Sequence, residues 1–175
     1  MPSRLRVPFG YVLGILVVAV ARPTPATLLA GGLLALSGEA LRLWSSGHID
    51  KTRALATGGP YAHTRNPLYL GSLLMGAGVA VAAESAWAGL AVAAYFAGFY
   101  PSVMREEAAF LRQRFPDEYA AWAAAVPLFL PRATPAGPRT TTFDWERVGR
   151  NREWRTAVAI PAFGIILWAR GALLP

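Results

Sequence analysis

The sequence has 175 residues, of which 54% are hydrophobic and only 15% are charged, and its mean hydropathy is +0.35. These values lie outside the range of soluble globular domains, so a water-soluble protein is nearly excluded. There is no cysteine, which excludes disulfide scaffolds, cysteine-ligated zinc, iron–sulfur clusters and thiol nucleophiles. The net charge of +7 would fit nucleic-acid binding in a soluble chain, so the placement of the charges has to decide its meaning.

Five apolar stretches predict five membrane helices, because each is bounded by charge or proline and has close to the roughly 17–25 residues that cross a bilayer. They are residues 9–21, 27–44, 68–83, 86–104 and 156–174. The first stretch is short, and the Arg22-Pro23-Thr24-Pro25 run after it prevents extension. A cleaved signal peptide is the competing interpretation, but the next segment is itself of membrane length and no polar domain follows a cleavage site.

The positive charges give an orientation. Fourteen of the 17 cationic residues precede the first stretch or lie in the connections 45–67 and 105–155. Only Arg22 and Arg170 fall on the opposite face, and Arg42 lies inside the second stretch. We therefore expect the long connections in the cytoplasm, and the low Lys and high Ala, Arg and Gly content indicates a prokaryotic inner membrane. Since topology explains the basic charge, no nucleic-acid partner is expected.

The 105–155 connection is long enough to carry function. Residues 106–115 and 117–125 have helical composition and predict an interfacial helix. Residues 126–131 are apolar and bounded by proline, which favours an extended segment, and residues 132–142 are polar and rich in Pro and Gly, which is typical of loose structure.

Residues 58–69 combine a Gly pair, two tyrosines, a His, an Arg and an Asn just before the third apolar stretch. Pro67 suits the first position of a helix, and the Gly pair allows a sharp turn that exposes backbone N–H groups. An elaborate helix cap explains this density. A site for a ligand that carries a carboxylate and a cationic centre explains it too, because a helix N-terminus, a guanidinium and aromatic faces come together.

Acidic residues give two further candidates. Glu106 and Glu107 follow the fourth stretch and point about 100° apart on a helix, so at most one faces a given pocket. They fit either a solvated helix end or a group that holds an ammonium or ribose hydroxyls. Glu39 and Arg42 lie three residues apart inside the second stretch, where charges are costly. They fit either a mutual pair that aids packing or a functional site.

The remaining motifs favour structural roles over functional ones. Gly76-Ala77-Gly78 is more typical of a close helix contact than of a ligand cradle, and no third glycine makes it a dinucleotide fingerprint. His48 and His63 are isolated, so no metal site is predicted. No nucleophile elbow, P-loop or kinase motif is present.

Several ordered blocks resemble one family. They are Gly47-His48-Ile49-Asp50-Lys51, residues 55–71, Arg105-Glu106-Glu107, Phe115-Pro116-Asp117-Glu118-Tyr119, Trp122, Val126-Pro127 and Leu130-Pro131. At these separations, over residues 47–132, the sequence is similar to the isoprenylcysteine carboxyl methyltransferases and their phospholipid N-methyltransferase relatives. The match of several blocks in order is more specific than any single motif.

This resemblance implies an integral membrane enzyme that takes S-adenosylmethionine from the cytoplasm and a lipophilic acceptor, with a carboxylate or amine head group, from the bilayer. By the family's motifs, Arg65, Asn66 and Glu107 are the catalytic candidates, and Glu39 and Arg42 are expected at the acceptor. The implied cofactor shell consists of Leu55, Gly59, Pro60, Tyr61, His63, Arg65, Asn66, Tyr69, Gly76, Gly78, Glu106, Glu107 and Tyr119.

Some positions depart from the family pattern. Asn66 stands where eukaryotic carboxyl methyltransferases have His, and Arg53 stands where some have an earlier His, so a general base at either place is in doubt. If an amine acceptor has to lose a proton, the nearby bases are Glu106, Glu107 and His63. Pro116 replaces a Gly, which alters a turn.

The expected architecture is an all-α membrane bundle of about five transmembrane helices in one domain, residues 1–175. It contains a methyltransferase-like core at 47–132, a cytoplasmic connection at 133–155 and a last transmembrane helix at 156–174. Two alternatives stay open: a membrane-embedded NADPH-dependent reductase of related architecture, and a non-catalytic lipid-binding membrane protein. The sequence does not decide the acceptor or the oligomeric state.

Overall fold

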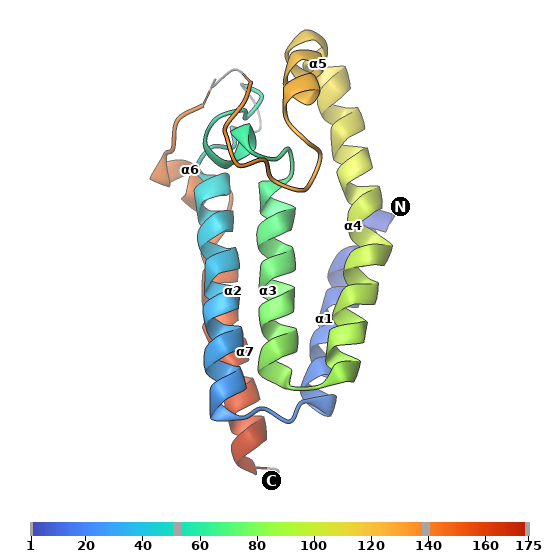
Figure 1. Ribbon diagram of the computed structural model, residues 1–175, viewed down its shortest axis with the longest axis vertical. Helices are drawn as coiled ribbons and strands as arrows, with labels where there is room; N and C mark the ends of the chain where they lie inside the picture. The colour runs from blue at the N-terminus through green and yellow to red at the C-terminus, as the bar shows by residue number, and fades with distance from the viewer. Residues whose placement is uncertain (1, 51–53, 138–140, 174–175) are drawn as a thin grey trace. The chain divides into compact units, whose positions relative to one another are not determined.

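The computed structural model describes residues 2–50, 54–137 and 141–173, with side chains from Leu5 onward (Figure 1). Lys51 and Arg53 lie outside these residues. In the described ranges the regular secondary structure is entirely helical, with no strand, which confirms the predicted all-α class. Its elements are α1 (Pro2–Val20), α2 (Pro25–Ser46), the 3-10 helix η1 (Gly59–Ala62), α3 (Pro67–Ala83), α4 (Ala86–Arg114), α5 (Pro116–Ala125), α6 (Trp145–Arg150) and α7 (Trp154–Leu173).

Within the residues that the structure describes, three helices, α2, α4 and α7, are long and apolar enough to cross a membrane. The apolar part of α1 (Leu5–Val20) and all of α3 are shorter. The 17 residues of α3 span only about 25 Å at 1.5 Å per residue, less than the roughly 30 Å of a bilayer core. Large apolar side chains nevertheless remain exposed on α1 and α7, among them Tyr11 at 74% and Ile15 at 71%, as expected for surfaces that face lipid.

Helix boundaries follow the local signals. α3 and α5 both begin at a proline, as predicted for Pro67, because the first helical position needs no N–H donor. α4 continues without a break to Arg114, so residues 106–114, predicted as part of an interfacial helix, are its last turns. Ala, Leu, Glu and Arg are strong helix formers and explain this continuation.

The chain forms two compact units. Unit 1 comprises Met1–Gly38, Leu73–Val103 and Thr156–Pro175, and unit 2 comprises Glu39–Ser72 and Met104–Arg155. Within unit 1 the buried core is built from small and medium apolar side chains of α1, α3, α4 and α7. Its members are Val17, Ala21, Ala82, Ala83, Ala88, Val92 and Leu167.

In unit 1, α2 and α3 lie side by side and touch through glycines (Figure 1). A Cβ added to Gly31 would lie 2.4 Å from the carbonyl oxygen of Gly78, and one added to Gly78 would lie 2.5 Å from that of Gly31. Gly76 in turn lies against the ring of Phe96, 2.6 Å from an added Cβ. The prediction of a close helix contact at the Gly76-Ala77-Gly78 motif is therefore confirmed.

Unit 2 is built around a second core of Leu55, Tyr61, Tyr119, Trp122 and Val126. The 3-10 helix η1 starts at Gly59, whose φ of +55° lies in the left-handed region that favours glycine. The buried imidazole of His48 packs against the same residue and leaves no room for a side chain. The predicted sharp turn at the Gly pair is thus present, and it directs Tyr61 into the core.

Candidate functional site

Two stretches that are distant in the sequence come together in unit 2. The backbone N–H of Arg65 donates to the carbonyl of Pro127 at 2.9 Å, and that of Arg132 donates to the carbonyl of His63 at 3.0 Å. The side-chain amide of Asn66 donates to the carbonyl of Leu128 at 2.8 Å. Residues 126–131, predicted to be extended, therefore run along the loop that precedes α3. Four residues before this segment, the indole of Trp122 makes a further contact with the same loop, by donating to the carbonyl of Tyr61.

Two polar pairs link the loop and α3 to α4 and α5. The hydroxyl of Tyr69 donates to the carboxylate of Glu107 at 2.7 Å. A guanidinium nitrogen of Arg65 donates to the hydroxyl of Tyr119 at 3.0 Å, and the same guanidinium lies 5.9 Å from the centre of the Tyr119 ring. The Nε of Arg65 is buried and makes no hydrogen bond. The pairs bring together four residues of the predicted cofactor shell.

A small hollow lies among these residues. Its cavity volume is about 10 Å³, and it is lined by Arg65, Asn66, Met104, Glu107, Ala108, Leu111, Tyr119, Trp122 and Leu128. We call it the unit 2 hollow. Its walls combine a guanidinium and a carboxylate with aromatic and aliphatic faces. This arrangement suits a ligand end that carries both charges.

Tyr61 is buried and its ring packs against that of Trp122, which lines the hollow. The indole nitrogen of Trp122 donates to the carbonyl oxygen of Tyr61 at 2.9 Å. Burial raises the pKa of the Tyr61 phenol well above its usual value of 10, and the charges of Glu107 and Glu153 raise it further. The phenol therefore stays protonated at physiological pH and offers no base.

A second polar cluster in unit 2 surrounds Arg42. One terminal nitrogen of its guanidinium contacts both carboxylate oxygens of Glu153, at 3.0 and 2.8 Å. The other donates to the hydroxyl of Ser72 at 2.6 Å and, more weakly, to the carbonyl of Leu68 at 3.4 Å. Glu39 lies only at the edge of ion-pair distance, 3.9 Å from the Nε of Arg42, and neither of its buried oxygens makes a hydrogen bond.

Sequence reasoning missed Glu153, the principal partner of Arg42. The only signal was indirect: an arginine inside an apolar helix needs a counter-ion, and Glu153 is an acid within an Arg-rich segment. The predicted pairing of Glu39 with Arg42 exists, but it is the weaker of the two contacts.

The other predicted site residues are distributed as follows. Leu55 and Pro60 are buried in unit 2, and Nδ1 of His63 lies 2.9 Å from the carbonyl of Arg132. Glu106 is exposed on α4. Gly76 and Gly78 belong to unit 1, so their part in a cofactor site stays a prediction. Among the residues described, no group of three or more His, Cys, Asp or Glu side chains is placed to hold a metal ion.

Two curated proteins are similar to part of the chain. The cobalt-zinc-cadmium resistance protein CzcN of Cupriavidus metallidurans is 40% identical over 108 residues, which cover 60% of this chain and 50% of that protein. The nickel-cobalt-cadmium resistance protein NccN of Alcaligenes xylosoxydans xylosoxydans is 36% identical over 110 residues, 61% of this chain and 51% of that protein. The chain thus spans about half the length of the curated relatives it matches. No solved structure matches.

The family comparison covers a similar share of the chain. The model of the phospholipid methyltransferase family matches residues 11–118. The matched part includes Arg65, Asn66, Tyr69 and Glu107, and thus the loop and the α4 carboxylate that meet at the unit 2 hollow. By its sequence and its apolar helices, the chain belongs to the phospholipid methyltransferase family of membrane proteins.

Proposed function

We propose that the protein is an S-adenosylmethionine-dependent methyltransferase that acts on a lipophilic acceptor in the membrane. The observation that carries this proposal is the convergence of Arg65, Tyr119 and Glu107 on one hollow, within and next to the family-matched segment. Arg65 and Glu107 offer opposite charges to one small ligand. This is the complement of an amino acid's carboxylate and ammonium groups.

The residues of the unit 2 hollow fit one end of the cofactor. The buried Nε of Arg65 has no hydrogen-bond partner and is free to donate to a carboxylate. Glu107 accepts one hydrogen bond, from Tyr69, and its carboxylate has further capacity for an ammonium or for hydroxyls. The hollow has a cavity volume of only about 10 Å³, far below the roughly 300–1,000 Å³ of typical ligand sites. The segment 126–131 therefore has to shift to admit a whole cofactor.

S-adenosylmethionine, when bound, supplies an electrophilic methyl group on a sulfonium. The chain's own contribution is to hold donor and acceptor in line, which lowers a barrier by several kcal/mol in favourable cases, up to about 7–11 kcal/mol. Asn66 acts as a positioning residue, because its amide nitrogen fixes the carbonyl of Leu128. An amine acceptor has to lose a proton, and among Glu106, Glu107 and His63 only Glu107 lines the hollow.

The cluster at Arg42 forms the acceptor end in this proposal. Both terminal nitrogens of Arg42 already have partners, so the guanidinium has little left to offer an anionic head group. Glu39, by contrast, has two buried oxygens that make no hydrogen bond, so they can accept hydrogen bonds from an ammonium group. The cluster favours an amine over a carboxylate as the head group of the acceptor.

We propose that the hollow faces the cytoplasm at a prokaryotic inner membrane, and the cation placement supports this orientation. The names of the two relatives describe resistance to cobalt, zinc, cadmium and nickel. We propose that the methylated product serves such a process here. Loss of metal tolerance in a deletion strain, restored by the native chain but not by a Glu107→Ala chain, tests this.

Calorimetric titration of the purified protein with S-adenosylmethionine tests the enzymatic proposal. Arg65→Ala and Glu107→Ala should each weaken binding by about tenfold or more, the loss expected for a charge-assisted hydrogen bond. Arg112→Ala is the matched control, because Arg112 also stacks on Tyr119, at 5.7 Å, but does not line the hollow. Unchanged affinity in both site variants refutes the assignment.

Two further arms separate the alternatives. Binding of NADPH in place of S-adenosylmethionine would favour the reductase, and binding of neither would favour a non-catalytic lipid-binding protein. Transfer of a labelled methyl group into a total lipid extract, followed by identification of the labelled species, names the acceptor.

A further inference from the structure

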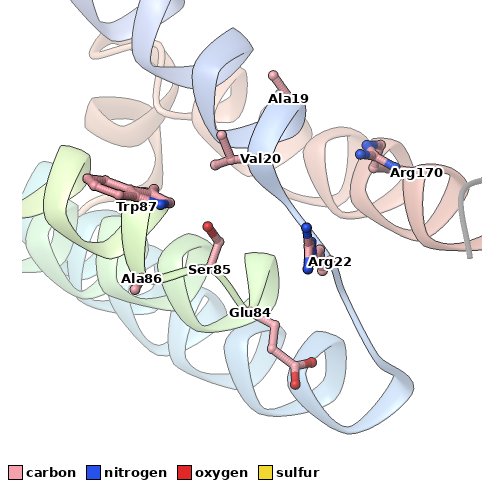
Figure 2. A pocket seen from close by; sticks show the side chains of 8 residues that line it. All are labelled: Ala19, Val20, Arg22, Glu84, Ser85, Ala86, Trp87 and Arg170. Atoms are coloured by element: carbon pink, nitrogen blue, oxygen red, sulfur yellow. The ribbon is translucent and has the colours of Figure 1, made fainter.

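Unit 1 contains a pocket of its own, whose lining includes none of the residues of the proposed methyltransferase site. It is lined by Ala19, Val20, Arg22, Glu84, Ser85, Ala86, Trp87 and Arg170, and has a volume of about 870 Å³ including space open to solvent (Figure 2). We call it the unit 1 pocket. It lies where α1 ends, where the turn between α3 and α4 passes, and where the last turn of α7 begins.

Backbone contacts fix these three elements against one another. The N–H of Arg22 donates to the carbonyl of Ala83 at 2.8 Å, which ties the segment after α1 to the end of α3. Gly171 packs against Pro23, whose carbonyl oxygen would be 3.0 Å from an added Cβ. Arg22 and Arg170 are therefore held on neighbouring pieces of backbone, and Figure 2 shows both guanidiniums at the same side of the pocket.

The two guanidiniums share the pocket without counter-ions. Among the described residues, neither Arg22 nor Arg170 has an ion pair or a side-chain hydrogen bond. Glu84 also lines the pocket, but its carboxylate accepts a hydrogen bond from the hydroxyl of Thr27 at 3.1 Å and extends away from the guanidiniums in Figure 2. The pocket thus keeps an excess of positive charge.

The N-terminus of α4 adds hydrogen-bond donors. Ser85, Ala86 and Trp87 line the pocket where this 29-residue helix begins. The first N–H groups of a helix have no partners within it, and the helix dipole makes this end attract anions. Two free guanidiniums and a helix N-terminus that face one space are the donor set of a phosphate site.

The surroundings identify the source of the phosphate. The pocket lies at the ends of apolar helices, and of its lining residues Trp87 is 73% exposed and Val20 is 37% exposed. Tryptophan at the end of a membrane helix lies at the level of the lipid head groups. We propose that the unit 1 pocket binds the phosphate group of a membrane phospholipid through Arg22, Arg170 and the N-terminus of α4. This proposal does not depend on methyl transfer.

The test is a titration of the full chain in a neutral detergent, followed by native mass spectrometry. Dioleoyl phosphatidic acid should bind saturably, whereas dioleoylglycerol, the same lipid without its phosphate, should not. Arg22→Gln and Arg170→Gln should each weaken phosphatidic acid binding by about tenfold, since each removes a charge-assisted contact. Arg150→Gln, which removes an exposed arginine of α6 in unit 2, is the matched control and should leave binding unchanged.

A fourth variant separates the site from a folding defect. Glu84→Gln removes the only carboxylate that lines the pocket and should tighten phosphatidic acid binding, an effect that misfolding does not produce. Full binding by the Arg22→Gln/Arg170→Gln double variant, or equal binding of dioleoylglycerol, overturns the proposal. If inorganic phosphate binds as tightly as the lipid, the pocket binds free phosphate, and the assignment to a phospholipid is wrong.

Discussion

Loss of charge at the two buried glutamates near Arg42 should affect stability differently. It should lower the free energy of unfolding at Glu153 and not at Glu39. Glu153 makes a two-point contact with Arg42, and their side chains are only 10% and 17% exposed. Breaking a buried ion pair from one side costs about 3–5 kcal/mol, because the other charge is left without a partner. Arg42 keeps Ser72 and the more distant Glu39, so Glu153→Gln should cost about 2–3 kcal/mol, below that range.

Glu39→Gln should cause no loss of stability. Neither carboxyl oxygen makes a hydrogen bond, and the 3.9 Å approach to Arg42 is at the limit of an ion pair. Removing a buried charge that lacks hydrogen bonds relieves a desolvation cost and leaves the Arg42–Glu153 pair in place. If Glu39 receives the acceptor, the same variant should lose methyl transfer while it keeps its fold, the usual exchange of stability for activity at a site.

Thermal unfolding in detergent, followed by far-UV circular dichroism, measures both effects. A midpoint shift of about 2–4 °C per kcal/mol for a chain of this size predicts that Glu153→Gln unfolds about 4–12 °C lower. A double-mutant cycle with Arg42→Gln isolates the pair and should give a coupling of about 1–3 kcal/mol with Glu153. Equal destabilisation by the two glutamate variants, or a larger coupling of Arg42 to Glu39, contradicts the reasoning.

Three further changes should have measurable effects on stability. Gly59→Ala should lower the free energy of unfolding by about 2 kcal/mol or more, because the positive φ and a neighbouring imidazole both oppose a side chain. Gly149→Ala, where nothing lies within reach of an added Cβ in α6, should leave that free energy unchanged or raise it by about 0.4–1 kcal/mol. Gly78→Ala should destabilise and Gly98→Ala should not, since only Gly78 touches the backbone of another helix; equal midpoints for these two would show that α2 and α3 do not need close approach. The raised pKa of Tyr61 means that the unfolded chain releases this proton first, so stability should fall as pH rises above about 10, and Tyr61→Phe should flatten that part of the profile.

The elements that could be read from the sequence are those with local causes. Pro67 and Pro116 mark helix starts because proline needs no hydrogen bond there, and the charged and proline-rich run after Val20 ends α1. The prolines that bound 126–131 correctly indicated a non-helical segment, but the structure bends at 126 and at 128–130 and does not run straight, as an extended segment would. The continuation of α4 to Arg114 was not foreseen as one helix, because the change from apolar to charged composition resembles a boundary although both parts favour helix.

The parts of the site that escaped prediction depend on distant pairings. Arg42 and Glu153 are separated by 111 positions, and no local pattern relates them. Asn66 is held by the carbonyl of Leu128, a group that every residue carries, so the sequence gives no sign of that partner. Family motifs did name Arg65, Tyr69, Glu107 and Tyr119, which the structure joins in two pairs. Their role toward a cofactor stays a prediction.

The boundary of the family match divides unit 2 in a way that bears on specificity. The match ends at residue 118, and it includes the charged residues of the hollow, Arg65 and Glu107. Its aromatic walls, Tyr119 and Trp122, and the counter-ion Glu153 follow that point, whereas most of its aliphatic wall lies before it. Charged residues that bind the cofactor are needed whatever the acceptor is, whereas the residues that contact the acceptor determine which head group fits. We therefore expect cofactor binding to depend on Arg65 and Glu107, and the aromatic wall and Glu153, together with Glu39 and Arg42, to influence which acceptor fits.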